Sequence, residues 1–165
     1  MKLRIVVGLA VLSILLTASA MSGGTATQRH LVVSKQRLQL YVVDGVDTIW
    51  RAPIGCGKNI GDKQRKGDNR TPEGTFRVKS IHKASHWTHD FSDGAGEREG
   101  AYGDWFIRLD VPRFSGIGIH GTCFPESIGT RCSEGCISLR NDDINKLKKL
   151  VFVGMTCTIE PDKRP

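Results

Sequence analysis

Residues 117–137 read IGIHGTCFPESIGTRCSEGCI and contain most of the residues on which the interpretation of this chain depends. The segment opens with a short apolar strand that ends at His120, and it finishes with Cys136 in a Ser-Glu-Gly-Cys turn. The two residues can meet in space if the loop between them folds back, and an imidazole beside a thiol supplies the base that a cysteine nucleophile needs. From spacing alone, a core histidine and a buried or disulfide-bonded cysteine explain the segment equally well.

Outward from this segment, the apolar pattern is that of a β protein. Short apolar runs are separated by polar or glycine-rich turns, and Asp44-Gly45 between two such runs is a strong hairpin signal. Strands are expected at 31–33, 38–42, 46–54, 75–81, 105–111, 117–120 and 155–159. One helix is expected to begin with Asn141 as its N-cap and to bury Ile144 and Leu147. The pattern predicts a single mostly-β domain of sandwich or barrel type with one or two short helices.

Length and composition limit the kind of protein. The chain has 165 residues and 39% hydrophobic content, which suits one folded domain and excludes a disordered tail or a second core of ordinary size. Its 24 Lys and Arg against 17 Asp and Glu give a formal charge of +7, which favours polyanionic partners only weakly. Residues 82–103 are a long polar stretch, and we expect a functional or mobile loop there.

Residues 1–20 have the pattern of a secretory signal peptide, in which a basic start and an apolar run precede the triplet Ala18-Ser19-Ala20. An uncleaved membrane anchor is the alternative, but the run is short for a span of roughly 20 residues. No stable membrane span is expected after cleavage. The predicted organisation is a signal peptide at 1–20, a linker at 21–29, a folded domain at 30–161 and a tail at 162–165. Export to the periplasm or cell wall follows, and it argues against nucleic-acid binding.

Three motifs in a fixed order carry a resemblance to a known family. They are TPEGTF at 71–76, IHGT at 119–122 and SEGCI at 133–137. In this order they resemble the bacterial L,D-transpeptidases of the YkuD type, and the similarity extends from about His30 to Ile159. The resemblance implies a mostly-β catalytic domain at 30–161 and a cysteine acyl-transferase that acts on peptidoglycan stem peptides.

The resemblance also assigns roles to individual residues. Cys136 is implied as the nucleophile and His120 as its base, with the Gly121 carbonyl orienting the imidazole. Gly135 and Cys136 are implied as oxyanion donors, and the motif at 71–76 is expected to shape the floor of the site. The expected substrate-binding residues are Ser133, Glu134, Arg140 and Asn141. Tyr102, an aromatic residue of the polar stretch at 82–103, is added to them as a residue expected to line the cleft. Neither a metal nor an organic cofactor is implied.

Two positions depart from the family pattern. Glu134 stands where the family usually has histidine, and Ser138 stands where it usually has arginine. A carboxylate at position 134 either pairs with a nearby cation or weakens thiolate formation. Loss of the arginine is expected to loosen the hold on a substrate carboxylate unless Arg140 or Arg131 replaces it. These departures favour the alternative function, a cell-wall binding module that keeps the fold without catalysis.

The five cysteines leave one thiol over if the chain is exported. We predict a disulfide between Cys123 and Cys132, with Cys136 free. Cys56 and Cys157 are either a second pair or two buried thiols. The alternative is a zinc site formed by the histidine of the second motif and the three clustered cysteines, but its spacing is not that of a standard zinc knuckle.

Two polar clusters are interpreted as solvated loops. His82, His86 and His89 have metal-ligand spacing, but no apolar helix face supports a site there. The basic run over 58–70 is interpreted as a solvated loop that can also face an anionic cell wall.

Taken together, the motifs and the resemblance predict an exported, monomeric L,D-transpeptidase. Its His120 is expected either to take the thiol proton during attack or to sit beside an existing thiolate.

Overall fold

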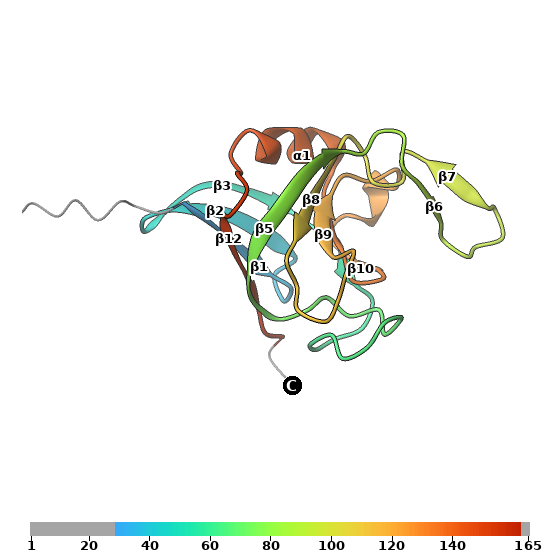
Figure 1. Cartoon of the computed structure of the whole chain (residues 1–165), viewed down its shortest axis with the longest axis horizontal. Coiled ribbons are helices and arrows are strands. Elements are labelled where there is room, and N and C mark those ends of the chain that lie inside the picture. Colours follow the sequence, from blue (N-terminus) through green and yellow to red (C-terminus); the bar gives the residue numbers. More distant parts are fainter. Residues whose placement is uncertain (1–28, 163–165) are drawn as a thin grey trace, which may run out of the picture.

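An eight-stranded sheet forms the body of the molecule (Figure 1). The computed structural model describes residues 29–162. The strand order is β11-β9-β8-β5-β12-β1-β2-β3, and two smaller sheets pair β10 with β4 and β6 with β7. The strands are β1 His30–Ser34, β2 Gln39–Asp44, β3 Asp47–Pro53, β4 Cys56–Gly57, β5 Gly74–Lys83, β6 Thr88–Asp90, β7 Glu97–Glu99, β8 Trp105–Leu109, β9 Gly118–His120, β10 Arg131–Ser133, β11 Ile137–Ser138 and β12 Thr156–Glu160. The helices are the 3-10 turn η1 Pro125–Ser127 and α1 Asn141–Lys148.

The expected strands and the expected helix are confirmed, with ends shifted by a few residues. The strands that come first and last along the chain, β1 and β12, are neighbours in the middle of the large sheet. They pair in parallel, with Leu31 opposite Cys157. Strand β2 continues from β1 as an antiparallel neighbour, and β5 covers the other edge of β12. The alternating residues Leu31 and Val33 are fully buried, because every second side chain of β1 points into the core.

The large sheet curls until residues near its two ends meet. Gly55, just beyond β3, forms an antiparallel bridge with Ser138 of β11, and each residue donates to the carbonyl of the other at 2.9 Å. A Cβ on Gly55 would lie 2.4 Å from Ser138 Oγ, so the approach needs a glycine on one side and a small residue on the other. The sheet is therefore nearly closed, which confirms the mostly-β, barrel-like fold class.

Helix α1 covers part of the core and buries Ile144 and Leu147, as the apolar spacing predicts. The predicted N-cap is wrong by one residue. Arg140 occupies the cap position without a side-chain cap hydrogen bond, and Asn141 is the first helical residue. The Asn141 side chain instead accepts a hydrogen bond from the Thr122 amide at 3.0 Å. It therefore ties the helix to the segment that follows β9 rather than to its own first turn.

The long polar stretch at 82–103 is not only a loop. It contains the hairpin β6-β7, in which His89 pairs with Arg98, and this hairpin projects from one end of the molecule (Figure 1). Its strands are short and have no fully buried residue, so no apolar alternation marks them in the sequence.

A buried ion cluster fixes the end of the described chain. Lys35 is 1% exposed, and its ammonium lies 2.7 Å from Glu73 and 3.1 Å from Asp162. The same ammonium donates to the carbonyls of Gly61 and Thr71 at 3.1 and 3.2 Å. The cluster therefore joins the end of β1 to two loops and to Asp162, which lies two residues beyond the end of β12.

The expected signal peptide and most of the expected linker fall at residues 1–28, outside the part of the chain that the structure describes. Within residues 29–162, no helix has the length and apolar character that crossing a membrane requires.

Candidate active site

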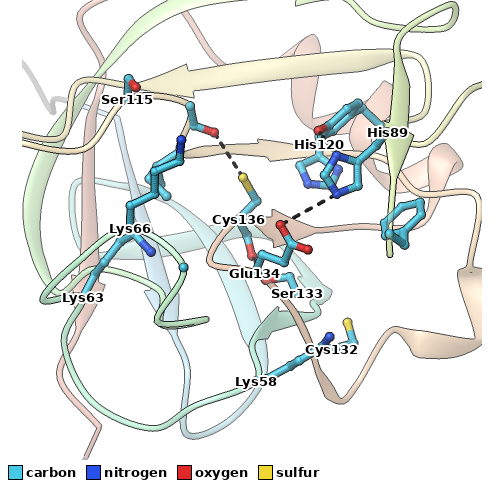
Figure 2. A pocket seen from close by; sticks show the side chains of 15 residues that line it. Lys58, Lys63, Lys66, His89, Ser115, His120, Cys132, Ser133, Glu134 and Cys136 are labelled. Carbon is cyan, nitrogen blue, oxygen red and sulfur yellow. Dashed lines mark hydrogen bonds and ion pairs between the residues drawn. The ribbon is translucent and has the colours of Figure 1, made fainter. Parts of the chain in front are cut away.

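A cavity of about 340 Å³ lies beside the turn that links β10 to β11 (Figure 2). It brings together residues from the basic loop, from the projecting hairpin and from the His-to-Cys segment. Its lining consists of Lys58, Lys63, Lys66, Gly67, His89, Phe91, Tyr102, Ser115, Gly116, Ile117, His120, Cys132, Ser133, Glu134 and Cys136. Both residues expected to carry the chemistry, His120 and Cys136, therefore face the same cavity.

His120 ends strand β9 and is 7% exposed. Its Nδ1 hydrogen bonds to the carbonyl oxygen of Gly121 at 2.5 Å, and its ring stacks on Phe106 with 5.5 Å between ring centroids. Because a carbonyl oxygen can only accept, Nδ1 carries the proton and Nε2 of the neutral ring is left as an acceptor. The imidazole therefore has the tautomer and the restraint that a general base requires.

Cys136 follows a turn that its neighbours hold in place. Ser133 Oγ donates to the Cys136 carbonyl at 2.5 Å and accepts from the Gly135 amide at 3.1 Å. Gly135 has a φ of 139°, and a Cβ there would lie 2.7 Å from the Arg70 carbonyl oxygen. Only glycine fits this position without displacing the loop. Steric demands therefore explain the glycine of the Ser-Glu-Gly-Cys turn, in addition to the chemistry of the cysteine that follows it.

Parallel pairing of β9 with β11 sets Ser138 opposite His120, which brings the Cys136 turn beside the histidine. The Cys136 thiol donates to the Gly116 carbonyl at 3.3 Å (Figure 2). In this conformation the thiol is therefore bonded to backbone and not to the imidazole. The thiol must therefore exchange this hydrogen bond for one with the imidazole before His120 can take the proton.

The electrostatics favour a neutral thiol and a neutral imidazole at rest. Burial raises the pKa of the Cys136 thiol to about 11, against the opposing effects of the Gly118 amide, Lys63 and Arg108. Burial lowers the pKa of His120 to about 4, although its hydrogen bond to Gly121 acts in the other direction. Of the two expected starting states, proton transfer during attack is thus favoured over a preformed thiolate.

This assignment predicts the pH dependence of Cys136 alkylation. A raised thiol pKa means that the thiolate fraction is small at pH 7 and grows about tenfold per pH unit up to the pKa. Iodoacetamide labelling of the Cys136 peptide, followed by mass spectrometry, should therefore be slower at pH 7 than labelling of free cysteine and should rise steadily to pH 10. His120→Ala should leave that slope intact. A rate that is already high at pH 6 and collapses in His120→Ala would show a preformed ion pair instead.

The oxyanion donors differ in their availability. The Gly135 amide is already bonded to Ser133 Oγ. Within residues 29–162, the Cys136 amide has no hydrogen-bond acceptor. The free donor at the site is therefore the amide of the nucleophile itself, which can stabilise a negatively charged oxygen on the attacked carbonyl.

Glu134 and Tyr102 meet around a residue that the sequence interpretation placed in a solvated loop. His89 of the hairpin lies 3.7 Å from the Glu134 carboxylate through Nε2, and its Nδ1 is 3.1 Å from the Tyr102 hydroxyl. The Tyr102 ring in turn packs edge-on against His120, with 5.0 Å between centroids. The family pattern has a histidine at position 134, and here an imidazole from β6 lies beside the carboxylate at that position.

Several expected site residues lie away from the cavity. Arg140 is exposed at the start of α1, and Asn141 binds the Thr122 amide. Arg131 is bound to Asp162 at 2.5 Å. Ser138 is 4% exposed against Gly55, so no substrate contact is available to it. Neither arginine therefore takes the place of the family arginine in this conformation.

The motif at 71–76 acts from behind the cavity rather than within its lining. Thr71 is 1% exposed, and its hydroxyl accepts from the Gly57 amide at 2.8 Å. Because Gly57 precedes Lys58, this contact positions the start of the basic loop.

Gly121 should tolerate no side chain. A Cβ there would lie 2.3 Å from Asn141 Oδ1 and 2.9 Å from the Gly103 Cα. Because overpacking typically costs about 1–3 kcal/mol, Gly121→Ala should lower the free energy of unfolding by roughly that amount in urea denaturation. Gly121→Ala/Asn141→Ala should recover part of the loss, since it removes the nearest atom. Wild-type stability in the single variant would contradict the packing described.

The predicted disulfide is not present. All five cysteines are free thiols, with Cys123 exposed, Cys132 partly buried, and Cys56 and Cys157 buried in the core. Cys132 lines the cavity, whereas Cys123 does not. Among residues 29–162, no cluster of three or more His, Cys, Asp or Glu side chains is arranged to hold a metal. The alternative zinc set is therefore not assembled in this structure.

Sequence interpretation did not assign the basic side chains of the cavity lining to the site, namely Lys58, Lys63, Lys66 and His89. Charge runs are usually solvated, and nothing in the spacing shows that the basic loop folds against the Cys136 turn. One signal was available, because Asp68 follows Lys63 by five positions and the two form an ion pair at 2.9 Å.

Comparison with known proteins agrees with the geometry. A family model for the L,D-transpeptidase catalytic domain (YkuD) matches residues 28–159. The Bacillus subtilis protein with the provisional name L,D-transpeptidase YqjB is 29% identical over 139 residues, which cover 82% of this chain and 73% of that protein. The provisionally named L,D-transpeptidase YkuD of the same organism is 38% identical over 60 residues, 36% of this chain and 35% of its own length.

Solved structures show the same fold. The catalytic domain of the E. faecium L,D-transpeptidase has a TM-score of 0.59 at 18% identity, covering 82% of this chain and 99% of that one. An L,D-transpeptidase from Mycobacterium smegmatis has a TM-score of 0.60 at 19% identity, covering 81% of this chain and 58% of the mycobacterial chain. With the family match extending over nearly all of the described residues, this chain belongs to the L,D-transpeptidase catalytic domain (YkuD) family.

Proposed function

We propose that the protein is an exported L,D-transpeptidase that uses Cys136 to transfer acyl groups between peptidoglycan stem peptides. His120 Nε2 takes the thiol proton as sulfur attacks the carbonyl of the third residue of a tetrapeptide stem. The Cys136 amide stabilises the resulting oxyanion. Collapse of this intermediate breaks the peptide bond, and the proton held by His120 passes to the leaving amine. Terminal D-Ala departs, and a thioester to Cys136 remains.

The thioester is then resolved by a second nucleophile. An amine from another stem forms a crosslink when His120 accepts its proton and the protonated thiol leaves. Water in the same position would make the protein a carboxypeptidase, and an amine on a wall-linked protein would make it an anchoring enzyme. The chemistry needs neither a metal nor an organic cofactor.

One observation carries this proposal. His120 and Cys136 face a common cavity from the paired strands β9 and β11, with the His120 proton held at Nδ1 by the Gly121 carbonyl. The family match supports the same chemistry. The pattern of residues 1–20 supports export to the periplasm or cell wall, which N-terminal sequencing of the exported protein would test.

The test is mass spectrometry of muropeptides after incubation with the protein lacking residues 1–20. Crosslinked dimers that have lost D-Ala would establish transpeptidation, and tripeptides without dimers would establish trimming. Retention of the protein on intact cell walls, with muropeptides unchanged, would favour the non-catalytic binding module that Glu134 and Ser138 allow.

A further inference from the structure

Lys63 is a buried cation of the Cys136 cavity that the proposed mechanism leaves unused. Its side chain is 6% exposed, whereas Lys58 and Lys66, the other lysines of the lining, are exposed. An ammonium group is costly to bury unless hydrogen bonds and an opposite charge replace its hydration. Because water and salt screen a buried charge less than an exposed one, Lys63 acts on its neighbours more strongly than an exposed lysine at the same distance.

Two acceptors hold the Lys63 ammonium in one place. It donates to the Asp68 carboxylate at 2.9 Å and to the Arg70 carbonyl at 3.4 Å. Asp68 also accepts hydrogen bonds from the amides of Gln64, Arg65 and Arg70 at 2.7, 3.0 and 3.1 Å. Burial alone would raise the pKa of Asp68, but these hydrogen bonds hold it well below its usual range, so its carboxylate stays charged. The three amides share that negative charge, which leaves the charge of Lys63 only partly compensated.

The same ammonium packs against the nucleophile turn. Gly135 is buried, and a Cβ built on it would lie 3.4 Å from Lys63 Nζ. The Arg70 carbonyl oxygen that accepts from Lys63 would lie 2.7 Å from that Cβ. The Phe114 ring lies beside the ammonium as well, with 5.6 Å between Nζ and the ring centroid. Lys63 therefore lies against the residue that immediately precedes the nucleophile, and its own partners fix it there.

Charges of both signs surround the thiol. Burial raises the pKa of the Cys136 thiol, and Glu134 raises it further, whereas Lys63 from the basic loop and Arg108 from β8 lower it. The charged and titratable groups around the thiol are Lys63, Arg108, Glu134, Tyr102 and His120. Figure 2 shows Lys63 on one side of Cys136 and His120 on the other. As His120 removes the proton, the sulfur gains negative charge, which a cation already held in place stabilises without reorganisation.

We propose that Lys63 is a positioning residue whose fixed ammonium stabilises the negative charge that develops on the Cys136 sulfur. Its effect on the thiol is a property of the folded chain, while its effect on turnover rests on the function proposed above. Loss of the Lys63 charge should slow every reaction of the Cys136 sulfur that passes through the thiolate. Loss of the Asp68 charge should not, because Asp68 has the opposite sign.

The test is iodoacetamide labelling of the Cys136 peptide at pH 8 in two variants that differ only at position 63. Asp68→Asn keeps Lys63 and an oxygen for its ammonium, and Lys63→Met/Asp68→Asn leaves no carboxylate without a partner. Labelling should be at least about threefold slower in the double variant, because a smaller thiolate fraction is offset only in part by the greater nucleophilicity of a more basic thiolate. Loss of the fold would have the opposite effect, since an exposed thiol has a lower pKa than the buried one and labels faster.

The matched control is Arg65→Met/Asp68→Asn. Arg65 is exposed on the same loop and lies outside the cavity lining, so water screens its charge. Labelling in this variant should stay within about 1.5-fold of Asp68→Asn. Lys63→Met against wild type repeats the comparison with Asp68 in place, and thermal melting shows which variants are folded.

D-Ala release from a tetrapeptide stem is the second measurement, and its kcat/KM should fall at least about threefold between Asp68→Asn and Lys63→Met/Asp68→Asn. Equal or faster labelling in folded variants that lack Lys63 would overturn the inference and leave the transpeptidase standing. Slower labelling with unchanged D-Ala release would overturn the part of Lys63 in the reaction. Slower labelling in a protein whose wild type releases no D-Ala would overturn the proposed function and leave the effect of Lys63 on the thiol intact.

Discussion

Cys136→Ala is expected to reduce D-Ala release from a tetrapeptide stem by roughly 10⁴-fold or more, as removal of a nucleophile does in other acyl-transfer enzymes. The proposed reaction runs through a thioester to the Cys136 sulfur, which alanine cannot form. Among residues 29–162, the side chain bonds only to backbone groups, the Gly116 carbonyl and the Gly118 amide, so the fold should survive the change. Release of D-Ala would be followed by mass spectrometry, and folding by thermal melting.

The matched control is Cys132→Ala, because Cys132 also lines the cavity but lies outside the proposed chemistry. This variant should retain turnover within a few-fold of wild type. His120→Ala should resemble the nucleophile variant in turnover, since the thiol pKa of about 11 leaves little thiolate without a base. Full activity in Cys136→Ala would exclude the proposed mechanism.

Lys35→Met is expected to lower the free energy of unfolding by about 3–5 kcal/mol, the range for removing one partner of a buried ion pair. Lys35 is 1% exposed and faces two carboxylates, Glu73 and Asp162, of which the second is itself bound by Arg131. Methionine fills a similar volume but leaves these carboxylates without their ammonium partner. Urea denaturation monitored by circular dichroism measures the loss.

Lys79→Met provides the comparison, since Lys79 forms an exposed ion pair with Asp110 and should cost less than about 1 kcal/mol. Similar losses in the two variants would show that burial of the Lys35 cluster does not determine its contribution to stability.

The same cluster predicts acid lability. Burial alone would raise the pKa of Asp162, but hydrogen bonds from Gly61, Lys35 and Arg131 lower it overall. A lowered folded-state pKa gives stability that is complete above the unfolded value of roughly 3.9 and is lost as the pH falls through the folded value. Unfolding free energies of wild type should therefore fall below about pH 4, and those of Asp162→Asn should fall less steeply.

The sheet could be predicted from sequence because its strands alternate. Leu31 and Val33 are both fully buried in β1, and Ile144 and Leu147 face the core from α1, as their spacing indicates. The hairpin β6-β7 could not be predicted, because none of its residues is buried and no apolar alternation marks it. Local pattern determines an element only where one of its faces meets a core.

Only part of the candidate site could be predicted from the sequence, for a similar reason. His120 and Cys136 lie in short motifs of fixed order, so sequence alone marks them as candidates, and both line the cavity. His89 and Glu134 are 45 positions apart in the chain, and their contact exists only once the hairpin has folded with His89 beside the cavity. For Asn141 the sequence pattern was misleading. Its residue type strongly favours the N-cap position, but its side chain instead binds an amide outside its own helix.

The pairing of β1 with β12 has a consequence for biosynthesis. Leu31 and Cys157 are neighbours in the sheet but lie near opposite ends of the chain, so the central ladder cannot form until almost the whole sequence is available. A nascent chain that still lacks β12 leaves one edge of β1 and one edge of β5 without a partner. Such long-range parallel pairing slows folding. A polypeptide of this topology would therefore complete its central sheet only after β12 has left the ribosome.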